Sequence, residues 1–138
     1  MISRRSIIPL ASPAIGCMLL LAACTPGAPD EPSLGSFTAG TCRQAAPALI
    51  RIDRLVHRVR DQHKKPKAIE SEMTAAQRQL RAVRPGADAT ANRSITQLVS
   101  DVGLLRISLD TNNYSPARLD QVSRSQQATV KYCTRKGT

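Results

Sequence analysis

Residues 90–110 read TANRSITQLVSDVGLLRISLD and carry the most apolar regular pattern of the chain. Apolar side chains recur there at intervals of three and four residues, which is the spacing of one face of an α-helix. This stripe consists of Ala91, Ile95, Leu98, Val102, Leu105 and Leu109, widened by Val99 and Leu104. Because no period-two alternation competes with it, we predict a helix from about Thr90 to Asp110.

Two amphipathic stretches precede this helix. The first opens with Thr41-Cys42-Arg43-Gln44, which has the form of a capping box, and it contains Pro47, where we expect a kink or a short leading turn. The second runs from about Lys67 to Arg84 and is ended by Pro85-Gly86. Their apolar faces are Ala45, Ala48, Leu49, Ile52, Leu55, Val56 and Val59 in the first, and Ile69, Met73, Ala76, Leu80 and Val83 in the second.

A fourth helical stretch follows residues 111–113. It opens with Ser115-Pro116, an N-cap residue followed by a proline at the first helical position. Gln126 and Thr129 interrupt its apolar face, so we expect this helix to pack least well. Four amphipathic helices with short loops favour an all-α fold, a small up-down-up-down four-helix bundle. A three-helix bundle with a loosely docked fourth helix is the alternative.

The first 23 residues have the three parts of an export signal. Arg4 and Arg5 are followed by an apolar stretch over residues 7–21, and the small residues Ala22 and Ala23 precede Cys24. The sequence Leu21-Ala22-Ala23-Cys24 resembles the lipobox of bacterial lipoproteins. This resemblance implies that residues 1–23 are cleaved and that the Cys24 thiol carries a diacylglyceryl group. The mature protein would then be lipid-anchored at the extracytoplasmic face of the cell membrane.

Other interpretations of this segment are less well supported. An uncleaved membrane anchor needs about 20 continuous apolar residues, whereas Pro9, Pro13 and Gly16 interrupt this stretch. Acylation at Cys17 would leave the strongest apolar block on the mature chain. The paired Arg4-Arg5 also resembles a twin-arginine export signal, so both the general and the twin-arginine routes remain open.

Residues 24–40 are predicted to form the lipidated cysteine and a flexible tether. Three prolines and three glycines follow Cys24 before Thr41, a composition typical of linkers. A flexible coil of this length spans roughly 20–25 Å. The helical domain, residues 41–138, would therefore sit close to the membrane, with its first helix beginning beside it.

The cysteine content predicts one disulfide. If Cys17 leaves with the signal and Cys24 is acylated, only Cys42 and Cys133 remain. Two thiols in an oxidising compartment favour a bridge. In an antiparallel four-helix bundle the start of the first helix and the end of the fourth lie at the same end, which agrees with this pairing. A redox-active pair is disfavoured because such pairs usually have CxxC spacing.

The chain is strongly basic, with 20 Lys and Arg against 10 Asp and Glu. The densest run lies in the first helix and the loop after it: Arg51, Arg54, Arg58, Arg60, Lys64, Lys65 and Lys67. We interpret this run as a basic surface patch at the tip far from the membrane. Its partner would be an anionic envelope polymer or anionic lipid headgroups. A solvated surface without a partner is the alternative.

Nucleic acid is not expected as a partner. Proteins that bind single strands usually stack bases on aromatic side chains, and this chain has only Phe37, Tyr114 and Tyr132.

His57, Asp61 and His63 are the only residues that suggest chemistry. A histidine and a carboxylate one helical turn apart can share a metal or a proton, but no further ligand set accompanies them. We therefore expect an ordinary i, i+4 ion pair, no metal, no cofactor and no catalytic residue. The predicted function is a non-enzymatic binding module of the cell envelope. A structural or sensory lipoprotein acting through a protein partner is the alternative, and a small histidine-dependent enzyme is a distant third.

Overall fold

The computed structural model describes residues 31–61 and 65–134, which are helical and contain no strand. The four α-helices are α1 (Thr41–Arg60), α2 (Glu70–Val83), α3 (Ala89–Asp110) and α4 (Pro116–Thr134). Three short 3-10 helices accompany them: η1 (Leu34–Ser36), η2 (Pro66–Ile69) and η3 (Arg84–Gly86). The all-α prediction is confirmed, and η2 and η3 form the two ends of the stretch predicted as one helix from about Lys67 to Arg84.

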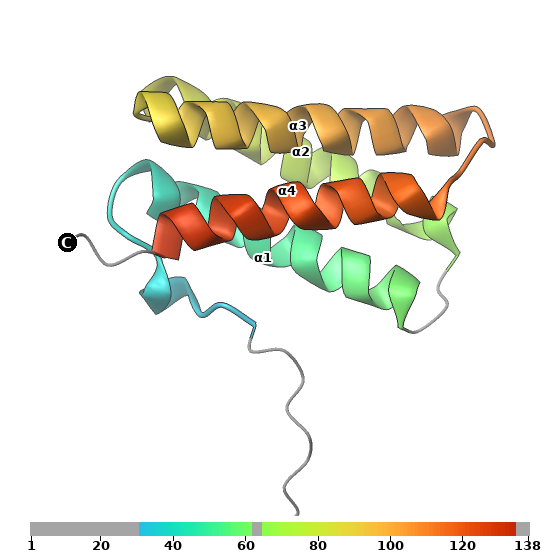
Figure 1. The fold of residues 1–138 in the computed structure, drawn as a ribbon, viewed down its shortest axis with the longest axis horizontal. Helices are drawn as coiled ribbons and strands as arrows, with labels where there is room; N and C mark the ends of the chain where they lie inside the picture. The colour runs from blue at the N-terminus through green and yellow to red at the C-terminus, as the bar shows by residue number, and fades with distance from the viewer. Residues whose placement is uncertain (1–30, 62–64, 135–138) are drawn as a thin grey trace, which may run out of the picture.

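Consecutive helices run in opposite directions along the long axis of the molecule (Figure 1). The helix α1 packs against α2 and α4, and α3 packs against the same two helices. As a result, the N-terminal end of α1 and the C-terminal end of α4 lie at the same end of the molecule (Figure 1).

Each helix contributes its apolar stripe to one core. The largest fully buried side chains include Leu49 and Ile52 from α1, Met73 and Leu80 from α2, Ile95, Leu98 and Leu105 from α3, and Val122 from α4. Within the described part of the chain, this core begins at Phe37 and ends at Cys133. The helical domain therefore holds its core within these residues.

The start of α1 differs from the prediction. Its N-cap is Gly40, which has a φ of 75° and provides no side-chain cap. The Thr41 hydroxyl instead donates a 2.7 Å hydrogen bond to the carbonyl of Gly86. The predicted capping box is therefore wrong, because the threonine binds η3 rather than its own helix. The helix also continues through Pro47 without a separate leading turn, with the proline ring on its exposed side.

The fourth helix packs more closely than its sequence suggested. Gln126 is 2% exposed and Thr129 is fully buried. The Gln126 side-chain amide donates to the carbonyl of Leu49 in α1 at 3.3 Å, and the Thr129 hydroxyl donates to the carbonyl of Ser125 at 2.8 Å. Buried polar groups are tolerated when they are hydrogen-bonded in this way. The prediction that these two residues would loosen the packing of α4 is wrong.

Candidate functional site

The disulfide fixes one end of the molecule. Cys42, in the first turn of α1, is bonded to Cys133, in the last turn of α4, and their Cα atoms are 5.2 Å apart. Both residues are buried in the core. The predicted bridge is confirmed, and it joins positions 91 residues apart in the sequence.

The residues before α1 are attached to the same end. We call residues 31–40 the lead segment. Its Phe37 is 2% exposed and belongs to the core. The backbone N–H and the hydroxyl of Thr38 both donate to the carbonyl of Cys133, at 2.9 and 3.1 Å. The Arg43 guanidinium donates to the carbonyl of Phe37 at 2.9 and 3.2 Å. The lead segment is thus bound to both α1 and α4.

From this attachment the lead segment turns back along α1. Glu31 lies against Arg54 in the second half of that helix, and the Arg54 Nε is 2.9 and 3.0 Å from the two carboxylate oxygens. The hydrogen bond from Arg54 lowers the pKa of the Glu31 carboxyl. The described chain therefore reaches the domain alongside α1 rather than at the start of that helix (Figure 1). This changes which surface lies closest to a tether.

The structure pairs most of the predicted basic patch with acidic groups. Besides Arg54, Arg58 bonds Glu72 at 2.7 Å, and Arg60 pairs with Asp120 of α4. Lys67 lies 2.7 Å from Glu70 and 3.3 Å from Asp110. Its pKa is raised, chiefly by its hydrogen bond to Glu70. These pairs tie α1 to the lead segment, α2 and α4, and η2 to α2 and α3. The run is not a bare positive surface.

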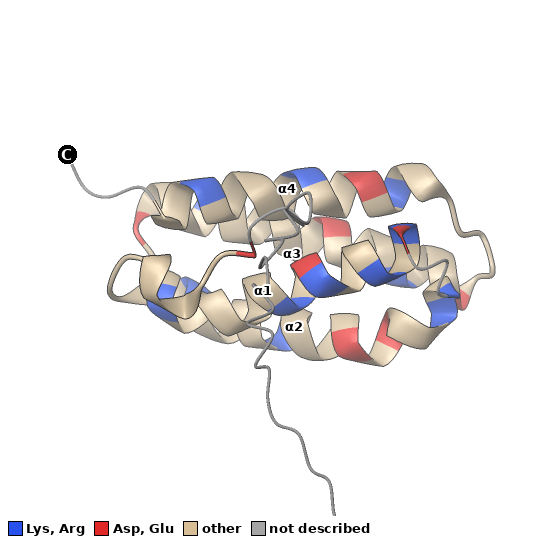
Figure 2. Ribbon diagram, turned by 90° about the horizontal axis from the view of Figure 1, so that it is seen from below, with Lys and Arg blue, Asp and Glu red and all other residues tan. Residues whose placement is uncertain are grey.

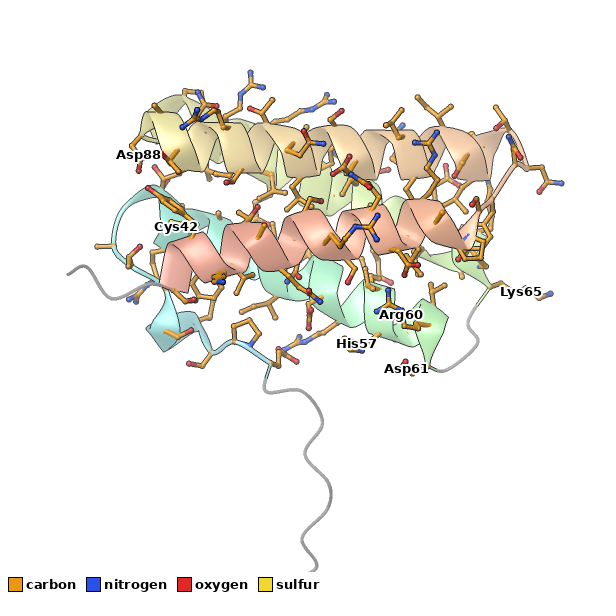
Figure 3. All side chains as sticks on the ribbon, viewed as in Figure 1. Cys42, His57, Arg60, Asp61, Lys65 and Asp88 are labelled. Atoms are coloured by element: carbon orange, nitrogen blue, oxygen red, sulfur yellow. A yellow bond between two sulfur atoms is a disulfide. The ribbon has the colours of Figure 1, made fainter. Side chains whose placement is uncertain are left out.

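Two further members of the predicted patch have no acidic partner among the described residues. Arg51 and Lys65 are exposed and form no ion pair within residues 31–61 and 65–134. Lys64 lies outside the described residues. Figure 3 shows Arg60, Asp61 and Lys65 toward the end of the molecule opposite Cys42, as the sequence had predicted for the end of the first helix. Arg51, Arg54 and Arg58 neighbour one another on the surface of α1, since they are three, four and seven residues apart.

His57 lies between the carboxylate of Asp53 in α1 and the carboxylate of Asp61, the C-cap residue of α1. Its Nδ1 is 2.9 Å from the Asp61 Oδ2, and its Nε2 is 3.9 Å from the Asp53 Oδ2. Burial raises the pKa of the Asp53 carboxyl. The charge of His57 lowers this pKa by a smaller amount, and the charge of Glu31 raises it slightly further. The predicted i, i+4 pair is confirmed, while His63 lies outside the described residues.

No group of three or more His, Cys, Asp or Glu side chains in the described part of the chain could hold a metal ion. None of the helices described here is both long and apolar enough to cross a membrane.

Asp88 makes two polar contacts at the disulfide end that the sequence predictions missed. Asp88 is the N-cap of α3, and its Oδ1 accepts hydrogen bonds from the backbone N–H groups of Thr90 and Ala91 at 2.8 and 2.9 Å. Its Oδ2 accepts from the Tyr132 hydroxyl of α4 at 2.9 Å. The bond from Ala91, followed by that from Tyr132, lowers the pKa of Asp88. Asp-Ala-Thr-Ala before an apolar stripe is the signal that could have identified this cap.

An apolar pair is exposed on the outer side of α3. Leu104 is 41% exposed and Ile107 is 60% exposed. They are three residues apart, so they neighbour each other on the helix surface. The prediction that Leu104 belongs to the buried stripe of this helix is wrong.

Comparisons with protein-family models, with curated proteins and with solved structures find no match to this chain.

Proposed function

We propose that this chain is a lipid-anchored, extracytoplasmic protein of the cell envelope whose domain is a non-enzymatic binding module with a basic surface. Its anchor is a diacylglyceryl group on Cys24, and residues 1–23 are the cleaved signal. Its domain is an up-down-up-down four-helix bundle, in which α1 and α4 are joined at one end.

The observation that carries this proposal is the disulfide between Cys42 and Cys133. Disulfides form and persist in oxidising compartments and are rare in the bacterial cytosol. A buried bridge between the two ends of the domain therefore agrees with export, which the lipobox-like Leu21-Ala22-Ala23-Cys24 independently suggests. Arg51 and Lys65, which are exposed and form no ion pair within residues 31–61 and 65–134, support binding of an anionic partner.

Metabolic labelling with a radioactive fatty acid tests the anchor. The full chain should incorporate label and sediment with membranes when it is produced in a bacterium. Cys24→Ala should lose both the label and the membrane association of the mature form. Cys17→Ala is the matched control and should keep both. Label that is lost in Cys17→Ala and kept in Cys24→Ala would overturn the assignment of the anchor.

A second candidate function, action through a protein partner, is favoured by Leu104 and Ile107. Two adjacent large apolar side chains on an outer helix face are a common feature of protein interaction surfaces. Replacing both with serine should leave stability nearly unchanged, because surface substitutions usually change it by less than about 0.5 kcal/mol. The same double variant should abolish crosslinking of α3 to a neighbouring protein in membranes, and unchanged crosslinking would contradict this candidate.

A further inference from the structure

The net positive charge of the four α-helices comes from two of them. The helix α1 contains five arginines and one aspartate, and α4 contains two arginines, one lysine and one aspartate. By contrast, α2 contains two arginines and two glutamates, and α3 contains two arginines and two aspartates. The formal charges are therefore +4 for α1, +2 for α4 and zero for both α2 and α3. The net charge of the helices belongs to α1 and α4 alone.

These two basic helices are neighbours in the molecule. The helices α1 and α4 pack against each other, and an ion pair between Arg60 and Asp120 joins them. We call the surface that they present the α1–α4 side. In Figure 2 basic residues recur along the ribbons of both α1 and α4. A surface charged along its length fits an extended anionic partner better than a single small anion.

Several cations on this side are not neutralised. Arg43, Arg51, Arg118, Arg124 and Lys131 are all exposed and form no ion pair with any residue in the ranges that the structure describes. Arg43 and Arg124 bond only neutral groups, the carbonyl of Phe37 and the side chain of Gln121. In α4, Arg124 and Lys131 are seven residues apart and lie on the same face of the helix. The free charge therefore extends beyond the run that the sequence highlighted.

The lead segment lies on this same side. It is bound to Cys133 of α4 and to Arg43 and Arg54 of α1. Glu31 is seven residues after Cys24, and seven residues reach at most about 25 Å when fully extended. A lipid on Cys24 would therefore hold Glu31 within that distance of the bilayer, and Glu31 is in direct contact with Arg54 of α1.

We propose that the α1–α4 side rests on anionic phospholipid headgroups, with α2 and α3 directed away from the membrane. This inference rests on the proposed lipid anchor. The cytoplasmic leaflet is not required, since any leaflet rich in anionic phospholipid attracts juxtamembrane cations. Anchoring by acyl chains is commonly reinforced by a basic surface. In this arrangement the exposed Leu104 and Ile107 of α3 stay available to a partner in the aqueous phase.

Vesicle binding by a lipid-free chain tests this orientation. A chain that begins at Thr25 lacks Cys24 and keeps the core, which runs from Phe37 to Cys133. It should co-sediment with vesicles that contain about 30% phosphatidylglycerol in phosphatidylcholine, because their surface is negatively charged. It should not co-sediment with vesicles of phosphatidylcholine alone. Binding should fall steeply with salt, because the Debye length shortens to about 3 Å at 1 M.

Two triple variants of equal charge separate the α1–α4 side from net charge. Arg51→Gln, Arg124→Gln and Lys131→Gln together should weaken vesicle binding about tenfold or more, since each surface cation adds to the attraction. The control is Arg78→Gln, Arg81→Gln and Arg93→Gln, which removes three exposed cations from α2 and α3. It should weaken binding far less. Circular dichroism checks that both variants keep the helical fold.

Three results would overturn the proposal: equal weakening by the two triple variants, no preference for anionic vesicles, or retention on a purified anionic wall polymer without binding to vesicles. Because the chain used has no Cys24, a negative vesicle result leaves the fatty-acid labelling result intact. If the full chain takes up no fatty-acid label but the chain that begins at Thr25 still binds vesicles, the lipid anchor is ruled out and the membrane-binding basic surface stands.

Discussion

Removing the disulfide should cost this domain a large part of its stability. Cys42 and Cys133 are 91 residues apart, so the bridge closes nearly the whole helical domain into one loop. In the chain-entropy model a loop of this size restricts the unfolded state by about 4–5 kcal/mol at 25 °C. Small domains have a total free energy of unfolding of about 5–15 kcal/mol. The double variant Cys42→Ala, Cys133→Ala should therefore be marginally stable.

Urea unfolding followed by circular dichroism measures this effect. The chain that begins at Thr25 should lose about 1.5–4.5 M in its urea midpoint on substitution of both cysteines, given slopes of about 1–3 kcal/mol per molar urea. Reduction of the unsubstituted chain should produce a similar loss, which controls for the changed side chains. A loss below about 1 kcal/mol in both experiments would refute the entropic reasoning, since natural bridges in small domains typically contribute 2–5 kcal/mol. It would show that the lead segment and core packing hold the two ends together unaided.

Three other substitutions have defined outcomes. Asp88→Ala removes the N-cap of α3 and should lower the melting temperature at pH 7 by about 4–8 °C. Because the pKa of Asp88 is lowered in the folded state, its stabilisation is present above its ordinary pKa and is lost in acid, so the difference from the unsubstituted chain should shrink as the pH falls below 3.8. Asp53→Asn should raise the melting temperature at pH 7, because burial raises the pKa of the Asp53 carboxyl and ionisation of this carboxyl therefore opposes folding. The gain should vanish below pH 3.8, where the carboxyl is protonated in both the folded and the unfolded chain. Gly103→Ala should fail to give the gain of about 1 kcal/mol normally expected inside a helix, because a Cβ there would lie 3.0 Å from the Gln77 Nε2. In a Gln77→Ala background the gain should return, and thermal unfolding of the four chains in this cycle checks it.

The helices were predictable because each carries its information locally. The apolar spacing in residues 90–110 and the Ser115-Pro116 start gave helices whose observed ends differ by about one residue, which is the ordinary uncertainty of helix ends. The disulfide was also predictable, since two cysteines remained once the export signal was assigned. Both conclusions needed only the order of residues along the chain.

The surface was harder to predict because its contacts join distant positions. Arg54 meets Glu31 across 23 residues, and Arg60 meets Asp120 across 60. No local pattern indicates that these cations are neutralised. The same holds for Gln126, whose burial depends on the carbonyl of Leu49, 77 residues away. A polar residue on a helix face therefore suggested loose packing, whereas its partner lay on another helix.

The basic patch was placed only in part, because the course of the lead segment was not visible in the sequence. Three prolines and three glycines suggested a tether up to Thr41, but Phe37 is buried and Thr38 is bonded to Cys133. The ordered domain therefore extends back to at least Glu31. A tether before Glu31, if residues 24–30 form one, would therefore be shorter than predicted and would meet the domain beside α1.

Mass spectrometry of the N-terminal peptide tests the central claim most directly. The full chain is produced in a bacterium, extracted from membranes with detergent and digested with trypsin, and its first peptide is sequenced. The lipid-anchored account predicts a peptide that begins at Cys24 and carries a diacylglyceryl group on its sulfur. A peptide that begins at Arg5 or Ser6, where trypsin would cut an unprocessed chain, with an unmodified Cys24, or one that begins at Thr25, would contradict it.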